Sequence, residues 1–433
     1  MRFQLNKSLF GGIFTLFTGT AAAQLIAILL QPFLRRMFLP EDFGAYSVYL
    51  SLVSILVTLS TLRYEPAIVQ PEKKGDAVNL FFLAFYFNLI FSFFLMLIIG
   101  FFRNPLASFL NISRAQAWWL VFLPASVFML GTYQTMNYYL IRKKRFKAIS
   151  LNKGARRLTE GGVQLGLGAL GRPAGLVLGD VAGHVANVTS GLFQLKEAGF
   201  KAGLHSFPLQ RRLMRQYSDY PLYSMLPMAL NTFCLMIPAV FINKFYSQEV
   251  AGYFDLTRLV LVVPSALLTM SVGQVFLQEV SEKKRKGASF FGEYKQLLGV
   301  LSLLGLIFAL VMTLLGPWML GIYAGAPYQE SGRYGQILVW GTLARVAVSP
   351  LTMVYVGLRK LKAQAAWQIT YFALVCSLVF FRNLPVRQFI LILTGVEVLA
   401  YGINLVLIHG IVKQYHQEIP KGESGEGQAS QEQ

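Results

Sequence analysis

Long apolar runs separated by short polar loops form the main pattern along the chain. Most runs have the roughly 20 residues that an α-helix needs to cross a hydrocarbon core of about 30 Å. A backbone in lipid must satisfy its own hydrogen bonds, so only helices or closed barrels can span a membrane. The runs lack the alternation of apolar and polar positions that is typical of barrel strands. The pattern therefore predicts an all-α, polytopic membrane protein.

Twelve transmembrane helices are predicted from these runs. They cover residues 8–34, 43–62, 78–101, 116–140, 157–171, 174–194, 217–243, 250–276, 296–316, 334–357, 363–381 and 388–411. The fifth gives the weakest signal, because it is short and begins beside Arg156, Arg157 and Glu160.

The basic residues predict the orientation of the chain. Of 39 Lys and Arg residues, 28 fall on one side of the predicted membrane and nine on the other. The remaining two, Arg258 and Arg345, lie inside spans. Loops with an excess of positive charge stay in the cytoplasm, so both termini are predicted to be cytoplasmic. This distribution also accounts for the net charge of +19, and nucleic-acid binding is not predicted.

The longest polar loop, residues 196–216, divides the chain near its middle. It is predicted to join an N-terminal six-helix lobe, residues 1–195, to a C-terminal six-helix lobe, residues 217–411. Residues 412–433, which include a segment rich in Gly, Ser, Glu and Gln, are predicted to form a disordered cytoplasmic tail.

A short repeat supports this division. The loops at 40–46 and 247–253 share an acid, a pair of small residues and a tyrosine at an offset of 207. Because each lobe has an even number of spans, the two lobes would form a parallel pseudo-repeat. Such a repeat predicts a site along the interface of the lobes.

Enzymatic and metal sites are not predicted. Cys234 and Cys376 lie in apolar runs, the four histidines are scattered, and no Walker motif or Ser/His/Asp arrangement occurs. We therefore expect no metal, no cofactor and no enzymatic activity. The GxGxxG string at 166–171 lacks the βαβ context of a dinucleotide site. Glycines at four-residue spacing from Gly171 to Gly183 instead predict a bare helix face that a neighbouring helix can approach closely.

Charged residues inside the spans are the candidate functional residues, because a charge at the bilayer centre costs about 2.5–3.5 kcal/mol. Arginine suits a phosphate ligand, since its planar fork makes bidentate contacts and stays charged. A buried carboxylate can exchange a proton during transport. The predicted substrate-binding residues are Arg63, Arg258 and Arg345, and the predicted ion-coupling or gating residues are Glu65, Asp180, Asp255 and Glu397.

Structural roles remain open for these residues. Asp255 and Arg258 lie three positions apart and can pair on one helix. Glu65 can be the local partner of Arg63, and Asp180 and Glu397 can be hydrogen-bonding residues between helices. Arg345 has no acid within four residues, so its partner must come from another helix or from water.

Two segments resemble a known family. The run Leu62–Val69, which contains Arg-Tyr-Glu-Pro, and the Leu39–Tyr46 loop are similar to bacterial Wzx-type oligosaccharide flippases. That family belongs to the multidrug/oligosaccharidyl-lipid/polysaccharide exporter superfamily. The resemblance implies a V-shaped pair of six-helix lobes in the bacterial inner membrane. It also implies a cationic central cavity for an undecaprenyl-pyrophosphate-linked sugar unit, and of the candidate residues it covers only Arg63 and Glu65.

The predicted function is therefore the flipping of a polyprenyl-pyrophosphate-linked oligosaccharide by ion-coupled alternating access. The expected partners are this lipid-linked oligosaccharide, membrane lipids, a coupling ion (proton or sodium) and polysaccharide-assembly proteins. A cation-coupled multidrug antiporter of the same superfamily is the nearest alternative. A membrane-embedded polysaccharide polymerase or ligase is an alternative of another class, and the short outer loops of the chain argue against it.

Overall fold

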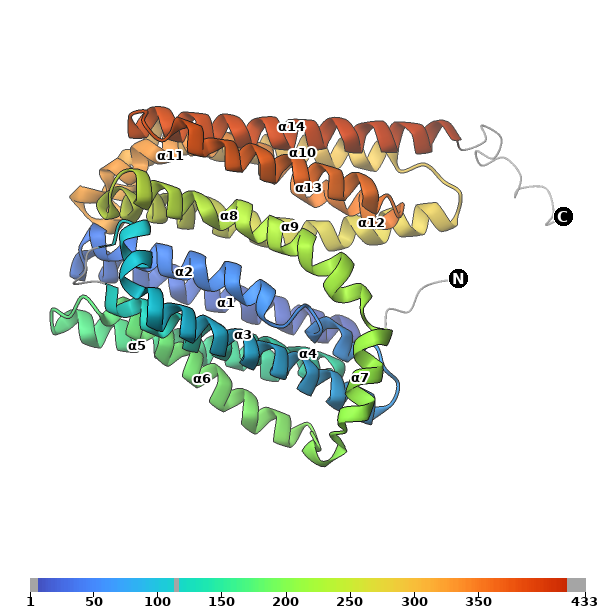
Figure 1. Ribbon diagram of the computed structural model, residues 1–433. Helices are drawn as coiled ribbons and strands as arrows, with labels where there is room; N and C mark the ends of the chain where they lie inside the picture. The colour runs from blue at the N-terminus through green and yellow to red at the C-terminus, as the bar shows by residue number, and fades with distance from the viewer. Residues whose placement is uncertain (1–6, 113–116, 419–433) are drawn as a thin grey trace. The chain divides into compact units, whose positions relative to one another are not determined.

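The computed structural model describes residues 7–112 and 117–418, which form helices and short connections without a strand (Figure 1). Fourteen α-helices occur in this part of the chain. They are α1 (Lys7–Met37), α2 (Pro40–Ser60), α3 (Lys74–Phe109), α4 (Leu123–Arg142), α5 (Phe146–Ala169), α6 (Gly175–Glu197), α7 (Phe207–Gln216), α8 (Met225–Phe245), α9 (Gln248–Arg285), α10 (Phe291–Ala324), α11 (Gln329–Val348), α12 (Met353–Gly357), α13 (Leu361–Cys376) and α14 (Val386–Glu418).

The predicted all-α fold is confirmed, and each predicted span corresponds to a long helix. The two additional helices are short: α7 lies in the loop between the sixth and seventh spans, and α12 continues α11 through a 3₁₀ turn at Ser349–Thr352. Within the described residues, eight helical segments are long and apolar enough to cross a membrane by length and composition alone. α14 continues to Glu418, so residues 412–418 are helical, and the rest of the predicted tail lies outside the described residues.

By packing, the chain divides into two compact units. Unit 1 comprises Met1–Leu256 with Trp318–Ser331, and unit 2 comprises Thr257–Pro317 with Gly332–Gln433. The division of the chain at residues 196–216 stays a prediction.

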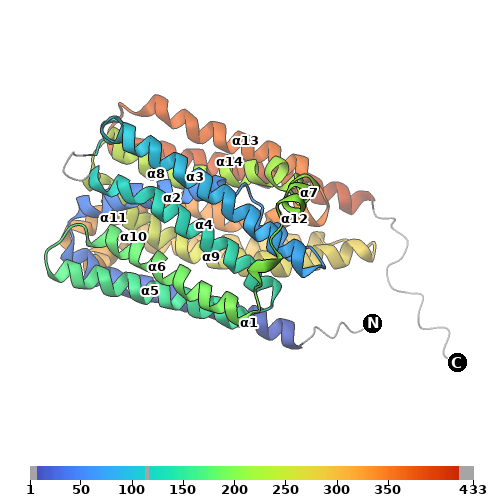
Figure 2. The ribbon, with the colours of Figure 1, turned by 60° about the horizontal axis from the view of Figure 1, so that its bottom comes forward.

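In unit 1, α5 packs against both α1 and α6, while α4 packs against α2, α3 and α6 (Figures 1 and 2). The glycines of α6 explain how closely α5 and α6 approach. A Cβ atom on Gly179 would lie 2.8 Å from the carbonyl oxygen of Glu160, and one on Gly183 would lie 3.0 Å from the Glu160 Cβ. The predicted bare helix face is therefore present at these two positions. It brings polar side chains of α5 and α6 together.

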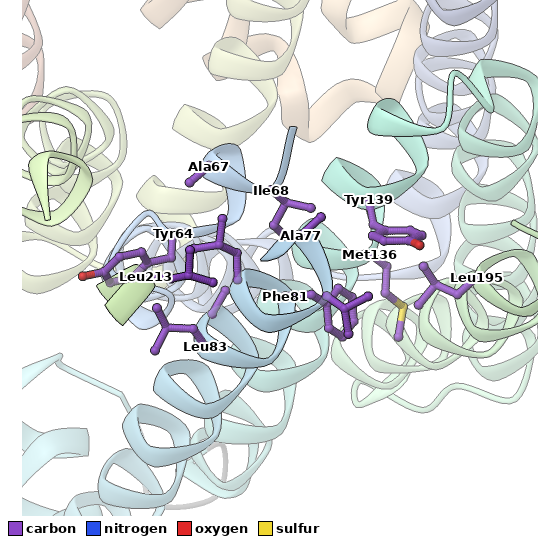
Figure 3. Packing of buried hydrophobic residues seen from close by; sticks show 13 residues of the cluster. Tyr64, Ala67, Ile68, Ala77, Phe81, Leu83, Met136, Tyr139, Leu195 and Leu213 are labelled. Carbon is purple, nitrogen blue, oxygen red and sulfur yellow. The ribbon is translucent and has the colours of Figure 1, made fainter. Parts of the chain in front are cut away.

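A cluster of buried hydrophobic residues packs parts of unit 1 together (Figure 3). It joins Phe81 of α3, Met136 of α4, Leu195 of α6 and Leu213 of α7. The segment before α7 is also tied to α3, because Asn79 donates a hydrogen bond to the carbonyl oxygen of Leu204 at 2.8 Å. α7 is thus a packed part of the unit.

Candidate functional site: paired charges in the helices

A buried charge network lies between α5 and α6. Asp180 has no exposed surface, and its Oδ1 accepts a hydrogen bond from Nη2 of Arg156 at 3.1 Å. Nε2 of His184 lies 3.2 Å from Oδ2 of the same carboxylate. One turn after Arg156, Glu160 pairs with Nη1 of Arg157 at 3.0 Å. Two acids therefore face two arginines, so the network is neutral when His184 is neutral.

α2 contributes to this network through Tyr46. Its hydroxyl donates to Oε1 of Glu160 at 3.3 Å. Gln164, one turn further along α5, donates to the carbonyl oxygen of Leu176 at 3.1 Å. The network thus links α2, α5 and α6, and a change in the charge of either acid would alter the packing of these three helices.

Arg35 at the end of α1 holds the beginning of α9. Its Nη2 donates to Oδ2 of Asp255 at 2.5 Å, and its Nη1 donates to the carbonyl oxygen of Gly252 at 3.2 Å. Nε donates to Gln31 at 3.0 Å, and the guanidinium lies 3.6 Å from the ring centroid of Phe43. The arginine is 3% exposed. Each of its three nitrogens therefore has a partner, which is the arrangement of a structural anchor.

Glycines allow the starts of α2 and α9 to cross closely. A Cβ on Gly44 would lie 1.8 Å from the carbonyl oxygen of Gln248, and a Cβ on Gly252 would lie 1.9 Å from that of Pro40. The contact is reciprocal, because each glycine meets the first residue of the other helix. The two repeated loops therefore pack on one another inside unit 1.

The connection after α2 carries Arg63 and Glu65. Leu62 and Arg63 have φ angles of 49° and 60°, a left-handed conformation that costs non-glycine residues about 1–3 kcal/mol each. Glu65 is buried; it accepts a hydrogen bond from Thr61 Oγ1 at 2.5 Å and pairs with Nη1 of Arg63 at 3.3 Å. This geometry presents the arginine and the carboxylate on one short turn.

Tyr64 links this turn to α7. Its hydroxyl donates to the carbonyl oxygen of Met214 at 3.0 Å. Burial raises the pKa of the Tyr64 hydroxyl, so it remains a neutral donor. The turn that carries Arg63 is therefore fixed to a neighbouring helix.

In unit 2, Arg345 of α11 pairs with Glu397 of α14. Nη2 of the arginine donates to Oε1 of the carboxylate, and both side chains are nearly buried, at 12% and 11% exposure. The ring of Tyr401, one turn after Glu397, has its centroid 6.0 Å from Cζ of the arginine. Within the described residues, Nε of Arg345 is buried and has no hydrogen-bond partner. This arginine is thus balanced in charge but keeps an unused donor.

Comparison with known proteins identifies the family. Residues 33–332 match the model of a family described as polysaccharide biosynthesis protein. The chain belongs to this family. A comparison with curated protein sequences gave no match.

Solved structures show which fold this polysaccharide biosynthesis protein has. It is similar to the lipid II flippase MurJ in an inward closed conformation, with a TM-score of 0.71 and 11% identity over 93% of this chain and 90% of that chain. It is also similar to an inward-facing multidrug resistance MATE family transporter of the MOP superfamily. The TM-score is 0.60, with 12% identity over 93% of this chain and 96% of that chain. A third similar structure is a MOP superfamily transporter from Pyrococcus furiosus. Its TM-score is 0.63, with 12% identity over 94% of this chain and 96% of that chain.

These likenesses establish the fold of MOP-superfamily transporters and flippases for this polysaccharide biosynthesis protein. The similar proteins are transporters and flippases rather than enzymes. The chain is accordingly a multi-pass membrane protein.

The predicted site residues are distributed over both units of this family member. Arg63, Glu65, Asp180 and Asp255 belong to unit 1, and Arg258, Arg345 and Glu397 belong to unit 2. Arg258 is half-buried on α9. That Arg63, Arg258 and Arg345 face one cavity stays a prediction.

Sequence reasoning missed three residues that complete these pairs. Arg156 and His184 join Asp180, and Arg35 joins Asp255. A signal for Arg156 was present, because it lies beside the fifth predicted span, whose first residues include Arg157 and Glu160. Arg35 gave no such signal, since it lies beside a predicted loop. Within the described residues, no group of three or more His, Cys, Asp or Glu could hold a metal ion.

Proposed function

We propose that this protein flips a polyprenyl-pyrophosphate-linked oligosaccharide across the bacterial inner membrane, with both termini in the cytoplasm. Membership in the polysaccharide biosynthesis family and the fold shared with a lipid II flippase support this substrate class. The transport cycle is alternating access coupled to a proton or sodium gradient. Arg63, Arg258 and Arg345 bind the anionic head of the substrate.

The buried Arg345–Glu397 pair is the observation that carries the proposal. A buried arginine must keep a counter-ion, because an unpaired buried charge costs several kcal/mol. A pyrophosphate oxygen can replace Glu397 as that counter-ion, since phosphate accepts the bidentate contacts that the guanidinium offers. The unused Nε of Arg345 is available for the second contact.

The displaced carboxylate supplies the coupling to protons. A buried carboxylate that loses its arginine is disfavoured in its charged form, so it takes up a proton. Substrate binding and protonation of Glu397 are then linked, so the affinity for the substrate depends on pH. In unit 1, Glu65 pairs with Arg63 and Asp180 pairs with Arg156.

Translocation of a fluorescent polyprenyl-pyrophosphate oligosaccharide in proteoliposomes tests this proposal. The double variant Arg63→Ala, Arg345→Ala should lose most of the activity, and Glu397→Gln should transport without its dependence on the proton gradient. Arg382→Ala, at an exposed arginine outside these pairs, is the matched control. Unchanged rates in the double variant at equal amounts of folded protein would refute the assigned roles.

A cation-coupled multidrug antiporter is the second candidate, because the chain also shares the fold of a MATE family transporter. This function would depend on the acids, above all Asp180, more than on the arginines. Expression would then confer resistance to lipophilic cations, and Asp180→Asn would abolish it. Resistance without oligosaccharide translocation would favour this candidate.

A further inference from the structure

An apolar groove runs along the outside of unit 1 between α3 and α6, with α4 as its floor. Its volume is about 320 Å³, near the lower end of the range of about 300–1,000 Å³ for ligand pockets. The walls are formed by aromatic and aliphatic side chains. They are Phe81, Phe82 and Phe85 on α3, Thr132 and Met136 on α4, and Leu192, Leu195 and Lys196 on α6, with Phe200 beyond α6.

The position of the one charged wall residue gives the groove a direction. Leu192 and Lys196 are one turn apart on α6, so the lysine stands at the end of the helix and the leucine one turn deeper. The groove is therefore charged at the membrane surface and apolar toward the membrane interior. A lysine at such a depth extends its ammonium to the headgroup region while its stem covers apolar surface.

A second cation stands near the same end. Lys143, just after α4, places its ammonium 5.8 Å from the ring centroid of Tyr139. That ring lies 5.0 Å from the ring of Phe200, which is part of the groove wall. Burial and the neighbouring charges of Lys74 and Arg142 lower the pKa of Lys143. The groove thus opens toward a concentration of positive charge.

The wall beyond α6 is fixed in place. Phe200 packs against Phe81 with ring centroids 4.8 Å apart. The chain that follows is tied to α3, because the backbone amide of Ser206 donates to Oδ1 of Asn79 at 2.7 Å. Figure 3 shows Phe81, Met136 and Leu195 gathered where the three helices meet. The groove is therefore built by packed side chains, and a flexible loop does not form it.

We infer that this groove holds one anionic phospholipid of the bilayer, with an acyl chain between α3 and α6 and the phosphate beside Lys196. Basic pockets between transmembrane helices recognise anionic headgroups. The aromatic walls offer the acyl chain a wide apolar contact. Leu192 is 55% exposed, so the acyl chain can enter the groove from the surrounding bilayer. The bound lipid would join α3, α4 and α6 at the end where α7 is attached.

Native mass spectrometry of the full chain in detergent tests this inference, with phosphatidylglycerol and phosphatidylcholine of identical acyl chains. The wild-type protein should retain one phosphatidylglycerol in preference to phosphatidylcholine. Lys196→Gln should lower this preference about fivefold, the effect of one basic residue near an anionic headgroup. Leu192→Trp should lower retention of phosphatidylglycerol by filling the groove.

Two variants serve as matched controls. Lys201→Gln removes an exposed lysine that is not part of the groove, and Phe193→Trp changes an exposed side chain next to Leu192. Both should bind lipid as the wild type does, and inorganic phosphate should not displace the lipid. Equal retention of the two lipids, equal effects of Lys196→Gln and Lys201→Gln, or displacement by phosphate alone would overturn the inference.

Discussion

The crossing of α2 and α9 offers the sharpest test of the packing. Alanine at Gly44 would place its Cβ 1.8 Å from the carbonyl oxygen of Gln248. An ordinary contact begins near 3.4 Å, so the helices must separate by about 1.6 Å. The opposing atom belongs to the backbone, so no side-chain rotation can relieve the clash. The same argument holds for alanine at Gly252, which would lie 1.9 Å from the carbonyl oxygen of Pro40.

The expected cost has two sources. Over-packing of this kind costs about 1–3 kcal/mol. Separation of the helices also stretches the hydrogen bond from Arg35 to the carbonyl of Gly252, and a bond to a charged group contributes about 1.5–3 kcal/mol. Gly44→Ala or Gly252→Ala should therefore lower the free energy of unfolding by about 2.5–6 kcal/mol.

Denaturant unfolding of the purified protein in one detergent measures these changes. Gly162→Ala is the control, because a Cβ on this exposed glycine of α5 would meet no neighbouring atom within 4 Å; it should gain about 0.5–1 kcal/mol. The double variant should cost less than the sum of the singles by more than about 0.5 kcal/mol, since one separation accommodates both methyl groups. Additive costs, or singles as stable as Gly162→Ala, would show that the helices do not cross here.

Three further predictions concern the charge pairs and the turn beside them. Arg156→Leu should lower the free energy of unfolding by about 3–5 kcal/mol by leaving Asp180 charged and buried, and adding Asp180→Asn should restore most of it; denaturant unfolding of both variants checks this. Tyr64→Phe should cost about 1 kcal/mol in the same assay by removing its hydrogen bond to α7. Arg35→Lys should lower stability while each folded molecule keeps its rate of translocation, whereas Arg345→Lys should lower that rate at nearly unchanged stability.

The helices could be predicted from the sequence because each is a local feature. An apolar run of sufficient length specifies a spanning helix wherever it lies, and the glycines at four-residue spacing marked the face of α6 that meets α5. Packing partners are not local. The repeated loops match in residue type at an offset of 207, yet the reciprocal contact makes Gly44 equivalent to Gly252 and Pro40 equivalent to Gln248, an offset of 208. The offset of 207 comes from matching residue types, whereas the offset of 208 depends on which backbone atoms are in contact.

The partners of the charges were harder to predict for the same reason. Asp255 has Arg258 three residues away, but the structure pairs it with Arg35, more than 200 positions earlier. The bend between α1 and α2 brings Arg35 to the start of α9, and no pattern within a single helix contains that information. Arg345 was a simpler case, since the lack of a nearby acid required a partner from elsewhere, which is Glu397 of α14.

The hydrogen bonds of Arg35 differ from those of Arg63 and Arg345, two of the arginines proposed to bind the substrate. A guanidinium carries five N–H donors on three nitrogens. Arg35 donates a hydrogen bond from each of these nitrogens, and an aromatic ring lies against its face. Arg63 and Arg345 each pair with one carboxylate, while their buried Nε atoms have no hydrogen-bond partner among the described residues. A buried donor without a partner costs about 1–3 kcal/mol, so an anion that reaches these two arginines gains a bond that their carboxylates do not provide. Under the proposed function, this difference favours the displacement of Glu65 or Glu397 by a pyrophosphate over the displacement of Asp255.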